Sequence, residues 1–237
     1  MKKFSVEEEF WDLFPDAQVN VLIIKGMDNH VDESNRIYFA ELLEKGKQEA
    51  EIFLTGEVFS QNPVVDEWRT AFRQFKTKKG ARSSIEALLK RVSQDRDFSP
   101  INPLVDIYNS ISLKYAVPCG GEDLDVIAGE LRLGKAKGGE HFFPLGADND
   151  SPALPGEIIY YDDEGAVCRC LNWREAKRTM LQEKTVNAVL VIESVNAEQA
   201  KRANEAAEEL KNLVDAYFKL DSTAIALTKD HPSFSLE

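Results

Sequence analysis

The sequence predicts an α+β fold in which a sandwich-like group of strands is flanked by helices. Between residues 32 and 115, apolar residues recur mostly at helical spacing. After Pro118, short apolar stretches alternate with turn signals at intervals of roughly ten residues, a pattern typical of sandwiches and barrels. A long amphipathic stretch over 199–220 then predicts one more helix.

The first half of the chain predicts one strand followed by helices. Val19–Ile24 is a β-branched apolar run that ends before Gly26, so we expect a buried strand there. Asp32 or Ser34 can cap a helix that runs to about residue 53. Further helices are expected at about 65–75, 83–92 and 104–115.

The second half predicts short strands. They are expected at 131–133, 141–143, 158–161, 167–171, 188–192 and 224–227, with a loose tail after the last one. The residues from Gly120 to Asp125 are interpreted as a loop that caps a helix over 124–128. We expect one compact unit, in which residues 1–60 form a strand–helix elaboration packed on a core domain of residues 61–237.

Composition excludes several classes of protein. No apolar run approaches the ~20 residues of a membrane span, and the first residues lack the apolar segment of a secretory signal. Three cysteines are too few for a disulfide framework, which favours the cytoplasm. Cys168 and Cys170 have no second ligand pair nearby, and no phosphate-binding glycine loop is present. We therefore expect no metal and no cofactor.

The net charge of −12 is unevenly distributed. Residues 67–96 contain nine Lys/Arg and three Asp/Glu, a local charge of +6, so the rest of the chain carries −18. A local basic face can bind phosphate while an acidic body repels other polyanions. The candidate RNA-binding residues are Arg69, Arg73, Lys78, Lys79 and Arg82. The alternative is a helix face whose charges meet only solvent.

Polar residues within apolar segments mark candidate sites. Asn102, Asp106 and Asn109 lie in the run 101–109, where a buried polar group without a hydrogen bond costs about 1–3 kcal/mol. They therefore indicate either a polar network in a core or the wall of a pocket. Glu193 ends the apolar run 188–192, where it can line the mouth of a pocket.

Two further clusters are candidates. Glu122, Asp123 and Asp125 follow two glycines, and they either belong to a capping loop or face a pocket and contact an amine or a hydroxyl. Asn172, Trp173 and Arg174 follow a predicted strand. Trp173 can stack on a ring and Arg174 can bind phosphate or carboxylate, although a structural role fits equally.

From about residue 67 to 193 the chain resembles the B3/B4 domain of the phenylalanyl-tRNA synthetase beta subunit, and particularly the free-standing proteins made of that domain alone. The motifs that carry the resemblance are the Arg82-Ser-Ser helix, Ile101-Asn-Pro-Leu-Val-Asp-Ile-Tyr-Asn109, Pro118 to Asp125, Gly138-Gly-Glu140, Pro155-Gly-Glu157 with Asp162, and Thr185 to Glu193. The resemblance implies a B3/B4-type fold and a site that hydrolyses tyrosine wrongly attached to the phenylalanine tRNA.

The resemblance also assigns residues. The family glutamate that recognises the tyrosine hydroxyl falls on Glu193. A family histidine falls near Gly120, and a glycine-rich wall falls near residues 172–175, which are bulky and polar here. We therefore expect a remodelled pocket for the amino-acid side chain.

The resemblance implies hydrolysis of a mischarged aminoacyl-tRNA ester, and this reaction fits a chain in which no nucleophile pair can be built from local sequence. Water held by Asn109 or Asp123 would attack the ester, and the terminal hydroxyl of the tRNA would assist. We expect Asn109, Asp123 and Glu193 to bound one pocket. The predicted substrate-binding residues are Asn102, Asp106, Glu122, Asp125, Asn172, Trp173, Arg174 and Glu193. The alternatives are a non-catalytic module that binds tRNA or an amino acid, and a small-molecule hydrolase or amino-acid sensor.

Overall fold

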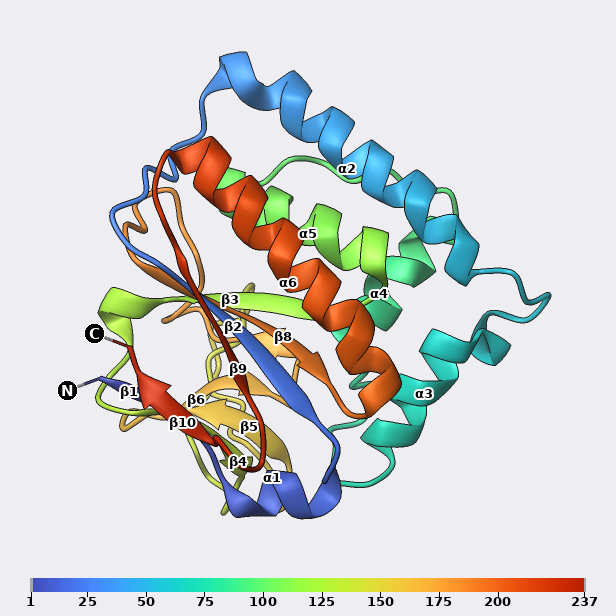
Figure 1. Cartoon of the computed structure of the whole chain (residues 1–237). Coiled ribbons are helices and arrows are strands. Elements are labelled where there is room, and N and C mark those ends of the chain that lie inside the picture. The colour runs from blue at the N-terminus through green and yellow to red at the C-terminus, as the bar shows by residue number, and fades with distance from the viewer. Residues whose placement is uncertain (1, 237) are drawn as a thin grey trace.

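The computed structural model describes residues 2–236 and contains two stacked sheets with a layer of helices on the outer face of one of them (Figure 1). One sheet has the strand order β10-β1-β4-β5-β6-β7, and the other has the order β3-β8-β2-β9. Helices α5 and α6 pack on the four-stranded sheet, and α2 packs on α5. The predicted α+β fold with a sandwich-like core is thus confirmed.

The strands are β1 (Lys3–Val6), β2 (Gln18–Ile24), β3 (Cys119–Asp123), β4 (Leu131–Lys135), β5 (Ile158–Tyr161), β6 (Ala166–Arg169), β7 (Arg174–Glu175), β8 (Ala188–Ser194), β9 (Thr223–Leu227) and β10 (Ser233–Ser235). The helices are α1 (Glu8–Leu13), α2 (Arg36–Ala50), α3 (Pro63–Phe72), α4 (Ser84–Val92), α5 (Pro103–Tyr115) and α6 (Ala197–Phe218). Short 3-10 turns cover η1 (Glu33–Asn35), η2 (Glu51–Phe53), η3 (Phe59–Gln61) and η4 (Leu124–Val126).

Strand β2 lies in the middle of the four-stranded sheet and separates two hydrophobic cores. Val19 and Val21 face the core between the two sheets, whereas Leu22 and Ile24 face the core beneath the helices. Alternate side chains of a strand point to opposite faces, so a strand between two cores is apolar at almost every position. This explains the continuous apolar run in the sequence.

Helices α5 and α6 begin at side-chain caps. The Asn102 side chain accepts a hydrogen bond from the Val105 N–H at 3.1 Å at the start of α5, and Asn196 accepts one from the Gln199 N–H at 2.9 Å at the start of α6. These caps satisfy N–H groups that the first helical turn leaves free. Lys219 ends α6 in the left-handed conformation, with φ of 56°.

Several predicted elements differ from the structure. Residues 119–123 form strand β3 rather than a loop, and only Leu124–Val126 form a helical turn after it. Residues 141–143 form no strand, because the Phe142 N–H and C=O bond to Asp150 Oδ1 and the Ser151 N–H within one loop. The tail is not loose, since β10 pairs with β1.

Residues 1–60 contribute strands to the interior of both sheets. Strand β1 lies between β10 and β4, and β2 lies between β8 and β9. The domain boundary near residue 60 stays a prediction.

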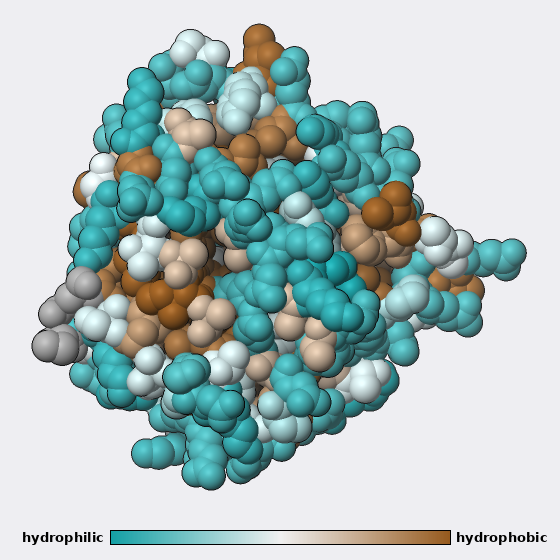
Figure 2. Space-filling model, viewed as in Figure 1, coloured by the Kyte–Doolittle hydropathy of each residue, from teal (hydrophilic) through white to brown (hydrophobic). Residues whose placement is uncertain are grey.

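Hydrophilic residues cover most of the face in Figure 2, and apolar residues show there in separate small areas. Within residues 2–236, no helix combines the length and the apolar character that crossing a membrane requires.

A fully buried ion pair connects strand β6 with the turn that precedes β5. Arg169 is 1% exposed and donates from Nε to Glu157 Oε2 at 2.8 Å, while Glu157 is 0% exposed. Arg169 also donates to the Ser151 carbonyl oxygen. The sequence pattern indicated only a turn at Pro155-Gly-Glu157.

We predict that Glu157→Gln lowers the free energy of unfolding by about 3–5 kcal/mol, because it leaves the buried Arg169 charge unpaired. Urea unfolding measures this change. The matched control is Glu198→Gln, which removes an exposed i,i+3 pair with Lys201 and should cost less than about 0.5 kcal/mol. Equal effects of the two substitutions would contradict the prediction.

Candidate functional site

A cavity of about 340 Å³ lies between the two sheets. Strands β3 and β8 form one wall, and residues of β4, β5, β6 and β7 line the opposite side. Its lining contains three carboxyl groups, from Glu122, Glu175 and Glu193. The lining also contains apolar side chains such as Val189 and Leu131.

The register of β3 and β8 places these groups. Glu122 lies opposite Val189, and Gly120 lies opposite Val191, in an antiparallel ladder. Because side chains alternate along a strand, Val189, Val191 and Glu193 share the face on which Glu122 lies. That face points to the six-stranded sheet, and the opposite face of β8 packs under the helices.

Glu193 is held by two hydrogen bonds. The Tyr160 hydroxyl donates to Oε1 at 2.8 Å, and the Asn172 amide donates to Oε2 at 3.4 Å. The Asn172 side-chain oxygen in turn accepts from the Ser84 N–H at 3.3 Å, at the start of α4. Burial raises the pKa of Glu193 to about 7, although the Tyr160 hydrogen bond lowers it in part.

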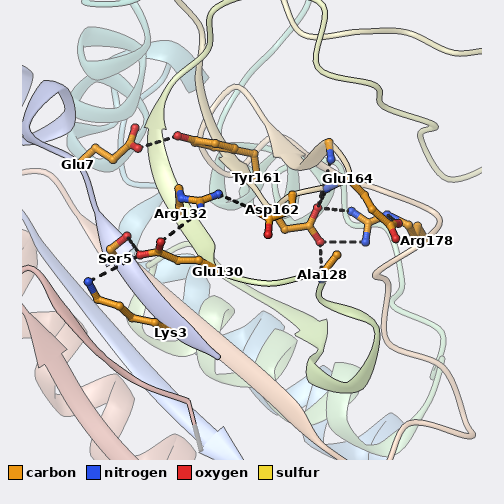
Figure 3. Close-up of polar contacts among 12 residues, drawn as sticks. Lys3, Ser5, Glu7, Ala128, Glu130, Arg132, Tyr161, Asp162, Glu164 and Arg178 are labelled. Atoms are coloured by element: carbon orange, nitrogen blue, oxygen red, sulfur yellow. Dashed lines mark hydrogen bonds and ion pairs between the residues drawn. The ribbon is translucent and has the colours of Figure 1, made fainter. Parts of the chain in front are cut away.

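Glu122 is less well satisfied. It is 7% exposed, and its Oε2 has no hydrogen-bond partner among the described residues. Burial and then the nearby Glu175 charge raise the pKa of Glu122 well above its usual value, although the Thr179 hydroxyl beside it and the Arg178 charge lower that pKa in part. The cation nearest to this end of the cavity is Arg178, which is already paired with Asp162 at 2.7 and 2.9 Å (Figure 3).

Glu175 takes up the space beside Gly120. A Cβ atom at position 120 would lie 3.3 Å from Glu175 Oε1. The resemblance placed a histidine near this position, and here a carboxylate from another strand fills the volume. Burial raises the pKa of Glu175 to about 7, and the Gly121 N–H lowers it in part.

Five of the predicted site residues line the cavity: Glu122, Asn172, Trp173, Arg174 and Glu193. The Arg174 guanidinium lies over the Trp173 ring, 5.3 Å from its centroid, and the Arg174 side chain is exposed. Glu175 and Tyr160 were not among the predicted residues. The pairing of Cys168 with Glu175 puts both on the cavity side of β6 and β7, but a two-residue strand gives no periodic signal.

The expectation that Asn109, Asp123 and Glu193 bound one cavity does not match the structure. Asp123 accepts hydrogen bonds from the Asp125 N–H at 3.0 Å and the Thr185 hydroxyl at 2.8 Å, so it caps η4. Asn109 is half-buried on α5 and does not line the cavity. The catalytic role of these two residues stays a prediction.

The remaining predicted substrate-binding residues have local partners. Asn102 caps α5 and also accepts from the Asn29 amide at 3.1 Å. Asp106 accepts from the Ile101 N–H at 2.9 Å, and burial raises its pKa to about 6. The Asp125 carboxylate accepts from the Asn187 amide at 2.9 and 3.0 Å. None of the three lines the cavity.

The predicted basic residues divide into paired and free-standing groups. Arg69 donates to Glu86 at 2.6 Å, Arg73 donates to the Thr70 hydroxyl at 2.6 Å, and Lys78 donates to the Ser151 hydroxyl at 2.6 Å. Lys79 and Arg82 are exposed in the loop before α4. Because Ser84 lines the cavity, these two cations lie within a few residues of its wall.

The chain belongs to the B3/4 domain family, whose model matches residues 67–222. It is similar to the phenylalanine–tRNA ligase beta subunit of Mycoplasma genitalium, with 31% identity over 103 residues, and to that of Cutibacterium acnes, with 35% identity over 68 residues. These matches cover 44% and 29% of this chain but only 12% and 8% of the two subunits. The predicted resemblance is thus confirmed.

A solved structure agrees at the level of the fold. An N-terminal fragment of the phenylalanyl-tRNA synthetase beta subunit from Pyrococcus horikoshii superimposes with a TM-score of 0.50. The match covers 95% of this chain and 54% of that fragment, at 12% identity. At this identity the likeness extends to the fold and not to the residues of the cavity.

We predict that Glu193→Gln becomes more stable relative to the parent protein as pH rises. A carboxyl group whose pKa is raised from 4.5 to about 7 by folding binds more protons when folded between these values. The parent protein therefore loses stability as pH rises from about 4.5 to 7, and the glutamine variant lacks this loss. Between pH 5 and 8 the difference should grow by about 2–3 kcal/mol.

Urea unfolding of both proteins across this pH range measures the difference. Glutamine keeps an oxygen that can accept the Tyr160 hydrogen bond, so packing is preserved. The exposed Glu198→Gln serves as control and should give a difference that does not depend on pH. A pH-independent difference for Glu193→Gln would contradict the assignment of a buried, proton-binding carboxyl group.

Proposed function

We propose that this protein hydrolyses the ester bond of a wrongly charged aminoacyl-tRNA. The observation that carries the proposal is the carboxyl-lined cavity of about 340 Å³ between the sheets of a B3/4 domain. Its volume is within the range of small-molecule sites. Editing at a second site is useful where binding discriminates poorly between similar side chains. The role in translation makes a cytoplasmic location the natural expectation.

The tRNA would approach along the loop before α4. Lys79 and Arg82 are exposed there, and the N-terminus of α4 begins at Ser84 in the cavity wall. The N–H groups at a helix N-terminus and nearby cations favour phosphate. The last nucleotides of the tRNA would lie at this rim, with the aminoacyl group inside the cavity.

The chemistry needs no protein nucleophile, because an aminoacyl ester is already activated. Water adds to the ester carbonyl carbon, the bond from that carbon to the terminal ribose oxygen breaks, and the proton passes to the departing oxygen. Glu175 is suited to accept the proton from water, since its pKa of about 7 matches neutral solution. We propose this role for Glu175 because it lines the cavity, in contrast to Asn109 and Asp123.

A second candidate is a module that binds charged tRNA or an amino acid without hydrolysis. The observation that favours it is the lack of any side chain at Gly120, where the resemblance implies a histidine. Binding of charged tRNA with an unchanged ester lifetime would identify this alternative.

We predict that the protein shortens the lifetime of at least one mischarged tRNA, and that Glu175→Gln slows this reaction about 100-fold, the usual contribution of a general base. A panel of tRNAs charged with radiolabelled amino acids measures ester loss. Glu164→Gln is the control, because its carboxylate contacts Arg178 at the surface. If no ester in the panel is lost faster than in buffer, the hydrolase proposal is abandoned.

We predict a salt-dependent affinity for tRNA that involves Lys79 and Arg82. Replacing both by alanine should reduce the slope of log affinity against log salt by about 1–2, because each phosphate contact releases a bound counterion. The control is Lys229→Ala, an exposed lysine in the turn between β9 and β10. A slope near zero for the parent protein would rule out phosphate contacts and favour a small-molecule role.

A further inference from the structure

We propose that the cavity selects an aminoacyl group whose side chain ends in a cation, such as a protonated amine. The inference rests on the proposed function, because it names the substrate class of the same site. It is carried by the buried Glu122 carboxyl group, one oxygen of which has no hydrogen-bond partner among the described residues, and by the neighbouring Glu175 carboxyl group.

Not all carboxyl groups of the cavity are available to bind a ligand. Both oxygens of Glu193 are occupied, by the Tyr160 hydroxyl and the Asn172 amide. Glu122 has a buried oxygen with no partner, and Glu175 lies close enough to shift its ionisation. A buried polar atom without a hydrogen bond is costly, so its retention in a cavity wall indicates a ligand group that completes it.

The charges around Glu122 indicate the charge of that ligand. Arg174 is exposed and lies over the Trp173 ring, and Arg178 is paired with Asp162 and contacts Glu164 at 3.4 Å (Figure 3). The Arg178 charge lowers the pKa of Glu122 only in part, and burial keeps that pKa well above its usual value. Two neighbouring carboxyl groups favour a cation over a neutral or anionic ligand. The described residues contain no group of three His, Cys, Asp or Glu that could hold a metal ion, so an organic cation fits better.

The shape of the cavity decides which end of the aminoacyl group contacts its buried carboxyl groups. Leu145, at the rim, is 61% exposed, whereas Glu122 is 7% exposed. The ester and the α-amine must stay near the rim, because the tRNA remains outside. Glu193, 1% exposed, and Glu122 are the most buried carboxyl groups of the cavity, and the oxygens of Glu193 are already occupied, so Glu122 contacts the far end of the side chain. Val189 and Leu131, both 1% exposed, provide an apolar wall against which the methylene groups of the substrate side chain can pack.

The tyrosine hydroxyl of the substrate that the family resemblance implies is a poorer fit to this cavity. Glu193 is the residue that would accept a hydrogen bond from a tyrosine substrate. Here the hydroxyl of the protein's own Tyr160 already donates to it at 2.8 Å. A substrate hydroxyl would have to displace this internal bond, so the contact gives little net selectivity.

The experiment measures binding of two free amides by calorimetry at pH 7.5. L-lysine amide and L-norleucine amide share the backbone and the methylene stem, and only lysine amide carries the terminal amine. We expect lysine amide to bind about 10- to 100-fold more tightly, the usual effect of a charge-assisted hydrogen bond. Nα-acetyl-lysine amide should bind like lysine amide, because the side-chain amine is the recognised group.

The variant Glu122→Gln should lose most of this preference and keep the affinity for norleucine amide, whereas Glu164→Gln should behave like the parent protein. The comparison of the two amides on the parent protein needs no variant, so it tests the proposal even if Glu122→Gln does not fold. Equal binding of the two amides, no binding of either, or loss of binding on Nα-acetylation would overturn the inference.

The outcome separates this inference from the proposed function. A preference for lysine amide without hydrolysis of lysyl-tRNA or any other charged tRNA would remove the hydrolase and leave the cation site in place. Faster hydrolysis of esters with neutral side chains, without a preference for lysine amide, would keep the hydrolase and remove the cation site.

Discussion

The close pairing of β3 with β8 is the constraint on which the cavity depends. A Cβ atom at position 121 would lie 2.2 Å from Leu190 Cδ2 and 3.3 Å from the Val189 carbonyl oxygen, so glycine lets β3 lie against β8 without displacing the Leu190 side chain. The register then sets the direction of every side chain on the cavity wall. A slip of one residue would turn Glu122 from the space between the sheets to the layer of helices. The charge of the cavity is thus decided by the register in which β3 pairs with β8.

Elsewhere in the fold, buried carboxylates have either a cationic partner or local hydrogen bonds. Glu157 is paired with Arg169, Glu86 with Arg69, and Asp162 with Arg178. These pairs avoid the cost of a buried, uncompensated charge. Asp106 and Asp123 instead accept hydrogen bonds from backbone N–H groups, and Asp123 also accepts one from the Thr185 hydroxyl. Glu122 differs from both groups, because one of its buried oxygens has no hydrogen-bond partner among the described residues, and this favours a binding role.

Long periodic segments were predictable from the sequence, and short or long-range features were not. The strand at Val19–Ile24 and the last helix were predicted because burial on two faces or on one stripe leaves a clear pattern. Strand β10 has three residues and pairs with the opposite end of the chain, so local sequence carries no trace of it. Glu122 and Glu193 were found because polar residues stand out at strand ends. Tyr160 was missed because a tyrosine in an apolar strand also fits a core.

Asp123 shows why a polar residue in a sequence motif need not line the cavity. Its carboxylate is used by a backbone N–H two residues on and by Thr185, 62 residues away in the chain. The same reasoning applies to Glu193, whose oxygens are occupied by Tyr160 and Asn172. A hydrogen bond that the protein makes with itself exists before any substrate arrives, and it cannot distinguish one substrate from another. For this reason the proposed selectivity is assigned to Glu122, one buried oxygen of which has no hydrogen-bond partner among the described residues.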